Sequence, residues 1–296
     1  MVALGQRVLM DWDWPGAGTT APEPRPSPRV ARPTKDEVAA RRDILARTIK
    51  ADVIPRLLLA RSRAARPPLR SAATGLASVD ITELAGIAMT RDVPPAIAFA
   101  QSVQQRGVSV ETVFLDLLAP TARYLGELWE QDLADFGPVT LALTRLHQVL
   151  RFFGPAFLSE SATTGRDLRA LLAPVPGEQH NFGLAMVAEF FRRAGWNVVG
   201  EAMATRRELE AAVRGTWFAV VGLSLAAEVR LEALAACIRA IRRASRNPAV
   251  GILVGGPIFV AHPQLARSVG ADATAVDGRH AVLQANGLLT GIAHQV

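Results

Sequence analysis

The chain has 296 residues, half of them apolar, and a formal net charge of +6 that is carried by scattered arginines. This length favours two domains, and the longest apolar runs are strand-sized, far short of the roughly 20 residues of a membrane-spanning helix. The single cysteine, Cys237, excludes an intramolecular disulfide. Because the first 14 residues also lack the apolar stretch of a secretory signal, we expect a cytoplasmic protein.

Residues 1–33 form the first of three predicted parts. Proline recurs from Pro15 to Pro33, among glycines, threonines and arginines. A segment of this composition cannot bury enough apolar surface to offset the entropy that it loses on ordering. We therefore expect a disordered, proline-rich tail.

Residues 34–160 are predicted to form a helical bundle. The stretch from Thr34 to Glu37 has the form of a capping box, and apolar residues then recur at helical spacing as far as Leu58. Asp80 and Ser109 are suitable N-caps, and Pro94-Pro95 suits a first helical turn. Further helices are expected near 80–91, 94–106, 109–131 and 136–153, with the short connections that are typical of a bundle.

Residues 168–296 alternate between strand-like and helix-like segments, which predicts an α/β domain. Five runs are strand-like: Leu168–Ala173, Trp196–Val199, Phe218–Leu223, Val250–Val254 and Ala273–Val276. Helical segments follow them at about 181–194, 205–214, 228–245, 260–268 and 279–292. Five strands that alternate with five helices predict a doubly wound parallel sheet in flavodoxin-like order.

Three features of this α/β domain are expected at one edge of the sheet. His180 follows the first strand, Ser224 follows the third, and Gly255-Gly256 follow the fourth. Ligands of open α/β sheets bind at this carboxyl edge. A neutral imidazole is a good transition-metal ligand, and it works best when a carboxylate such as Glu178 holds its other ring nitrogen. Gly183 would let a bulky ligand approach, so these residues predict a ligand-holding domain organised around His180.

The pattern His180-x-x-Gly183, then Ser224, then Gly255-Gly256 resembles the cobalamin-binding Rossmann-like domain. That family usually carries Asp-x-His-x-x-Gly, Ser-x-Leu and Gly-Gly; this chain has Glu178 for the aspartate and Ser224-Leu-Ala226 for Ser-x-Leu. The resemblance implies that His180 is the lower cobalt ligand and that Glu178 orients it. It also implies that Ser224, Gly255 and Gly256 line a channel for the nucleotide tail of cobalamin.

The helical part resembles the cap bundle that precedes this domain in B12-dependent methyltransferases and photoreceptors. Such caps place a tryptophan over the upper face of the corrin, which implies this role for Trp129. Val139-Thr140 stands where light-dependent repressors carry Glu-His, and the resemblance implies that this pair contacts the cofactor. His147, about two helical turns after Thr140, is either a bundle-surface histidine or a second metal ligand above the cobalt.

A closer resemblance, over about residues 45–295, is to the AerR/PpaA family of photosynthesis regulators. It is carried by Val53-Ile-Pro55-Arg-Leu, Leu128-Trp-Glu-x-Asp132, Val139-Thr140 and Gly177-Glu-Gln-His180. It implies a cobalamin-dependent antirepressor that binds a CrtJ/PpsR-type repressor of pigment genes. Adenosylcobalamin or hydroxocobalamin would be the cofactor, and light would act by cleaving the cobalt–carbon bond of an alkylcobalamin.

Two other functions compete with this one. A haem-binding redox or gas sensor of similar fold would also use His180, although Ser224 and Gly255-Gly256 favour a corrin because haem has no nucleotide tail to bury. A protein-interaction module with a vestigial pocket is the other. The sequence shows no Ser-His-Asp order, phosphate loop or metalloprotease motif, so we expect a protein that is not an enzyme. Direct contact with DNA stays open, and no membrane association is expected.

Overall fold

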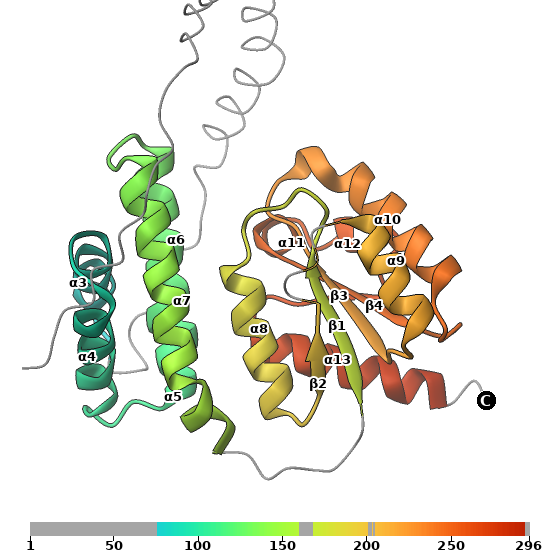
Figure 1. Cartoon of the computed structure of the whole chain (residues 1–296), viewed down its shortest axis with the longest axis horizontal. Coiled ribbons are helices and arrows are strands. Elements are labelled where there is room, and N and C mark those ends of the chain that lie inside the picture. Colours follow the sequence, from blue (N-terminus) through green and yellow to red (C-terminus); the bar gives the residue numbers. More distant parts are fainter. Residues whose placement is uncertain (1–75, 160–167, 201–202, 204, 294–296) are drawn as a thin grey trace, which may run out of the picture. The chain divides into compact units, whose positions relative to one another are not determined.

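The computed structural model describes residues 76–159, 168–200, 203 and 205–293, which are drawn as ribbon in Figure 1. These residues belong to one compact unit. The predicted tail at residues 1–33, the capping box at Thr34 and the helix expected after it lie outside the described residues. Within the described ranges, no helix combines the length and apolar character that crossing a bilayer requires.

The first described part is a helical bundle, as the sequence predicted. Its elements are α3 (Ser78–Thr90), α4 (Val93–Gln104), α5 (Val110–Thr112), the π-helical η2 (Val113–Leu118), α6 (Ala119–Glu130) and α7 (Phe136–Ser159). The single helix expected at 109–131 is therefore three consecutive pieces with a π-helical middle. The core of the bundle consists of aromatic and aliphatic side chains, and the rings of Phe114 and Phe157 have centroids 4.8 Å apart.

The helix starts of the bundle confirm one predicted cap and correct another. Ser109 is the N-cap of α5, where its hydroxyl accepts the backbone N–H of Thr112 at 3.1 Å. Asp80 is not an N-cap, because α3 begins at Ser78 and places Asp80 in its first turn. From there its carboxylate accepts the N–H of Ala77 at 2.9 Å and an N–H of Arg106 at 2.9 Å. A carboxylate in the first turn still stabilises the helix start.

The second part is a five-stranded parallel sheet in the order β2-β1-β3-β4-β5, which confirms the flavodoxin-like prediction. The strands are β1 (Arg169–Pro174), β2 (Asn197–Val199), β3 (Val220–Ser224), β4 (Gly251–Gly255) and β5 (Ala273–Thr274). The helices are α8 (Phe182–Arg193), α9 (Arg206–Gly215), the 3-10 helix η3 (Glu228–Arg230), α10 (Leu231–Ala244), α11 (Pro257–Ala261), α12 (Leu265–Ser268) and α13 (Gly278–Ala293).

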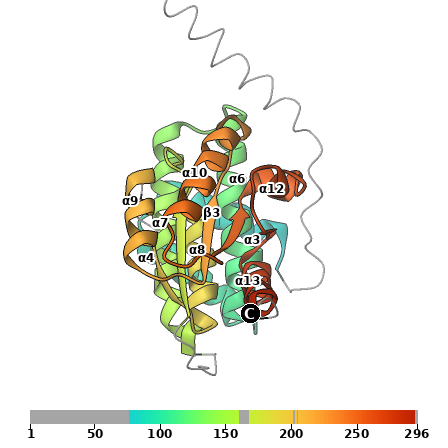
Figure 2. The same ribbon diagram turned by 90° about the vertical axis from the view of Figure 1, so that its right-hand side faces the viewer.

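Helices cover both faces of this sheet. Buried residues of α8 and α13 pack on one face, around Leu172 and Val220. Buried residues of α9 and α10 pack on the opposite face, around Leu171 and Val221. Figure 1 and Figure 2 show these two layers with the strands between them. Alternate residues of the same strands therefore feed two separate apolar cores, as a doubly wound sheet requires.

The bundle packs against the α8 side of this domain. α7 contacts α8, and the bundle core includes Phe182, Met186 and Phe190 from α8. The rings of Phe157 and Phe190 meet edge-on at 4.9 Å. The helix that opens next to His180 is thus shared by the bundle core and the sheet core.

Candidate functional site

The strand ends bring the predicted motif residues to one edge of the sheet. Ser224 is in register with Pro174 on one neighbouring strand and with Gly255 on the other. The amide of Leu225 donates to the carbonyl of Gly255 at 3.0 Å, which continues the pairing beyond the strands. His180 lies in the loop between β1 and α8. The carboxyl edge therefore holds all three elements of the motif.

Glu178 holds the ring of His180 through a hydrogen bond. One carboxylate oxygen, Oε1, accepts from Nδ1 of His180 at 2.6 Å and from the backbone amide of His180 at 3.0 Å. The other oxygen accepts the N–H of Ala226 at 2.9 Å, which joins this loop to the one after β3. The Glu178 side chain is 4% exposed, whereas the His180 side chain is 70% exposed. With Nδ1 donating to the carboxylate, Nε2 is the ring nitrogen left to bind a metal.

The electrostatics of this pair follow from its contacts. Burial raises the pKa of Glu178, but hydrogen bonds from the His180 ring and from the amides of Ala226 and His180 outweigh burial and lower this pKa to about 2. The hydrogen bond to Glu178 raises the pKa of His180 against the effect of burial, and the Glu130 carboxylate of the bundle also raises it. Glu178 is therefore ionised at neutral pH and makes the imidazole a more basic ligand.

The glycines of the motif serve different purposes. A Cβ added at Gly183 would meet nothing within 4 Å, so the start of α8 presents open space beside His180. At Gly255 the nearest atom to such a Cβ is the carbonyl oxygen of Ala275 at 4.0 Å. Gly256 has φ of 111°, and a Cβ there would lie 2.1 Å from the carbonyl oxygen of Leu225. Gly256 is thus required by the backbone, while Gly183 faces open space.

Two aromatic side chains of the bundle are exposed where α6 gives way to α7. Trp129 is 46% exposed and Phe136 is 65% exposed, with ring centroids 6.2 Å apart. Large apolar rings that stay open to solvent indicate a surface that a ligand or partner covers. Glu130, the neighbour of Trp129 in the chain, raises the pKa of His180, while the role of Trp129 above a corrin stays a prediction. Sequence reasoning overlooked Glu130, which no metal-ligand or capping pattern marks.

The remaining predicted bundle residues have contacts of their own. Val139 is buried in the bundle core, and the hydroxyl of Thr140 donates to the carbonyl of Phe136 at 2.8 Å. His147 has Nδ1 2.9 Å from the carbonyl oxygen of Leu143, and its ring meets Phe182 edge-on at 4.9 Å. His147 thus joins the bundle to the start of α8. The cofactor contacts assigned to Val139, Thr140 and His147 stay predictions.

Thr274 is a polar residue at this edge that the motif does not include. It lies on β5 in register with Val254, next to Gly255. Its Oγ1 is buried and has no hydrogen-bond partner among the described residues. A buried hydroxyl without a partner is costly and often marks a place where a ligand or water supplies the missing bond. The only sequence signal is a lone hydroxyl between Ala273 and Ala275 in an otherwise apolar strand.

Comparisons with known proteins agree with this geometry. Residues 168–285 match the family model described as B12 binding domain. A Rhodobacter capsulatus protein, described as an uncharacterized 20.5 kDa protein in the bchF-crtJ intergenic region, is 26% identical over 165 residues, covering 56% of this chain and 85% of that protein. The structure of the Methanosarcina barkeri monomethylamine corrinoid protein aligns with a TM-score of 0.58 and 14% identity, covering 73% of this chain and 100% of that one, and so shares the fold. The motif geometry and the match over residues 168–285 agree in indicating a B12-binding domain in this part of the chain, whereas the resemblance to the AerR/PpaA family stays a prediction.

Proposed function

We propose that the protein is a cobalamin-binding, light-responsive regulator of transcription in the cytoplasm, and that it is not an enzyme. In this proposal it is an antirepressor that binds a CrtJ/PpsR-type repressor of photosynthesis genes. The observation that supports it best is the Glu178–His180 pair, a buried carboxylate holding an exposed imidazole at the ligand edge of a B12-binding domain. The relative encoded between bchF and crtJ supports the regulatory part.

The described residues fit a bound corrin. Nε2 of His180 would be the lower cobalt ligand, and the space beside Gly183 would admit the corrin ring. Ser224, Gly255 and Gly256 would line the nucleotide tail, whose polar groups would also satisfy the buried hydroxyl of Thr274. Trp129, whose ring is exposed, would cover the upper face.

In this proposal, light would change the position of the bundle. Bound alkylcobalamin would supply a photolabile cobalt–carbon bond. Trp129 and Phe136, whose rings are exposed, would be the bundle side chains that respond to a change at the cofactor. Because both rings sit at the α6–α7 connection, the change would reposition the bundle relative to α8 and so bias a two-state element.

The first test is spectroscopic. The full chain is mixed in the dark with adenosylcobalamin or hydroxocobalamin, passed through gel filtration, and measured before and after green light. We expect a retained corrin spectrum that changes on illumination for adenosylcobalamin. The proposal fails if neither corrin is retained, and retention of haem instead would indicate a haem sensor of the same fold.

Variants then assign the ligand. His180→Ala should lose the imidazole-ligated spectrum, while His262→Ala, a matched change of an exposed histidine after α11, should keep it. A purified CrtJ/PpsR-type repressor bound to promoter DNA tests the partner. The wild-type protein should change the mobility shift of that complex in a light-dependent way, and His180→Ala should not. A shift of DNA by this protein alone would indicate direct DNA contact.

A further inference from the structure

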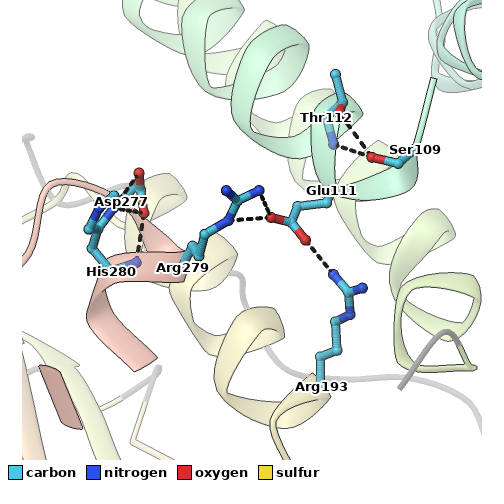
Figure 3. Close-up of polar contacts among 7 residues, drawn as sticks. All are labelled: Ser109, Glu111, Thr112, Arg193, Asp277, Arg279 and His280. Carbon is cyan, nitrogen blue, oxygen red and sulfur yellow. Dashed lines mark hydrogen bonds and ion pairs between the residues drawn. The ribbon is translucent and has the colours of Figure 1, made fainter. Parts of the chain in front are cut away.

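Glu111 is the point at which the bundle and the sheet domain share charges (Figure 3). Its Oε2 accepts from Nη1 of Arg193 at 2.7 Å, and its Oε1 accepts from Nε of Arg279 at 2.6 Å. Nη2 of Arg279 bonds to the same Oε1. Glu111 lies on α5, Arg193 ends α8 and Arg279 is in the first turn of α13. We call these three residues the Glu111 junction.

Aromatic packing surrounds the junction. The guanidinium carbon of Arg193 lies 4.3 Å from the ring centroid of Phe157, which is itself packed against Phe114 and Phe190. The side chains of Glu111 and Arg193 are 19% and 25% exposed, whereas that of Arg279 is 62% exposed. Charges that are partly withdrawn from water and shared within a network interact more strongly than exposed surface pairs. The junction is therefore a specific contact between the bundle and the sheet domain.

Both helix starts that present the junction are fastened by their own caps. The hydroxyl of Ser109, two residues before Glu111, caps α5 by accepting at 3.1 Å the N–H of Thr112, the residue after Glu111. The carboxylate of Asp277 accepts the N–H of His280 at 2.8 Å and lies 2.9 Å from its Nδ1, which orders the first turn of α13 around Arg279. Figure 3 shows these caps on opposite sides of the three ion-paired residues.

The contact at the ligand end of α8 is of a different kind. There the rings of His147 and Phe182 meet edge-on at 4.9 Å. Phe182 and Arg193 are the first and last residues of α8, which puts about 16 Å of helix between the two ends. Phe182 is also buried in the bundle core, so both ends of the interface have apolar packing, and the Arg193 end adds ion pairs and a cation–π contact to it.

We propose that the Glu111 junction is the fixed end of this interface, and that the bundle and the sheet domain move apart at the His147–Phe182 end. Only the coupling of this motion to cobalamin rests on the proposed function; the fixed end does not. A rotation of 5° about the junction would move the other end of α8 by about 1.4 Å, estimated from its helical length. That displacement is enough to change the cover over a bound ligand without separating the two parts.

Pulsed electron–electron double resonance of the full chain tests the proposal, with Cys237→Ala as background. One spin-label pair, Gln105→Cys with Asn197→Cys, spans the junction end at exposed positions of both parts. A second pair, Leu133→Cys with Val229→Cys, spans the ligand end. Without corrin we expect a narrower distance distribution at the junction end than at the ligand end. Glu111→Gln should broaden the junction-end distribution, and Glu83→Gln, an exposed carboxylate on α3, should not.

The outcomes separate this proposal from the proposed function. A junction-end distribution as broad as the ligand-end one in the unsubstituted background, or one that Glu111→Gln leaves unchanged, overturns the fixed end. These measurements need no corrin, so they decide the matter even if no corrin binds. Far-ultraviolet circular dichroism confirms that Glu111→Gln is folded, and Arg279→Gln, which removes one of the two partners, should broaden the junction end less than Glu111→Gln.

Discussion

Glu178 and His180 form a 2.6 Å hydrogen bond in which the carboxylate is buried and the imidazole is exposed. The buried partner also binds the amide of Ala226, so it is fixed by the sheet edge rather than by the ring that it holds. A ligand that binds Nε2 therefore finds the imidazole already oriented. The cost of ordering the ring is met when the protein folds and does not weaken ligand binding.

Glu178→Gln should weaken corrin binding without removing the lower ligand. Glutamine keeps an acceptor for Nδ1 but removes the negative charge that makes the imidazole basic. Loss of such an outer contact typically lowers metal affinity by about 10–100-fold. Titration of aquocobalamin followed by absorbance measures the change, and Glu83→Gln is the matched control. An unchanged affinity would show that the carboxylate charge does not act on the metal.

The same substitution should change how the free energy of unfolding of the apoprotein depends on pH. Folding lowers the pKa of Glu178 from 4.5 to about 2, so the ionised carboxylate stabilises the native state above pH 4.5. That contribution is lost as pH falls towards 2 and amounts to about 2 kcal/mol after allowance for solvent screening. Urea unfolding at several pH values should give a difference between wild type and Glu178→Gln that shrinks from pH 6 to pH 2. A constant difference would contradict the lowered pKa.

Two glycines of the motif should respond in opposite ways to alanine. Gly256→Ala places a Cβ 2.1 Å from the Leu225 carbonyl oxygen in a backbone conformation open almost only to glycine, and should lower the free energy of unfolding by about 3 kcal/mol. Gly183→Ala adds a methyl group in open space at the start of α8 and should leave the fold as stable as before. If Gly183 admits the corrin, its variant binds aquocobalamin more weakly. Thermal unfolding and absorbance titration of both variants decide the assignment.

The sequence predicted the fold, and the position of the motif residues at one edge of the sheet, because both follow from the order and spacing of strand-like runs. Alternating apolar runs revealed five strands, and the spacing of His180, Ser224 and Gly255 placed them at one edge. The π-helical turn at η2 carries no periodicity of its own, so it was missed. Glu111 could not be assigned either, since Arg193 and Arg279 are 82 and 168 residues away in the chain. Only the packing of α5 against two other helix ends brings these charges together.

Thr274→Val should show whether the buried hydroxyl bonds to the nucleotide tail of cobalamin or to a water molecule. Valine keeps the shape and removes an Oγ1 that has no partner among the described residues, so the apoprotein should gain about 1 kcal/mol in free energy of unfolding. If the hydroxyl bonds the nucleotide tail, the variant should also lose about tenfold in affinity for cobalamin. Its affinity for cobinamide, which has no nucleotide tail, should stay the same. Equal losses for both corrins would place Thr274 beside the ring, and a less stable apoprotein would mean that water already satisfies the hydroxyl.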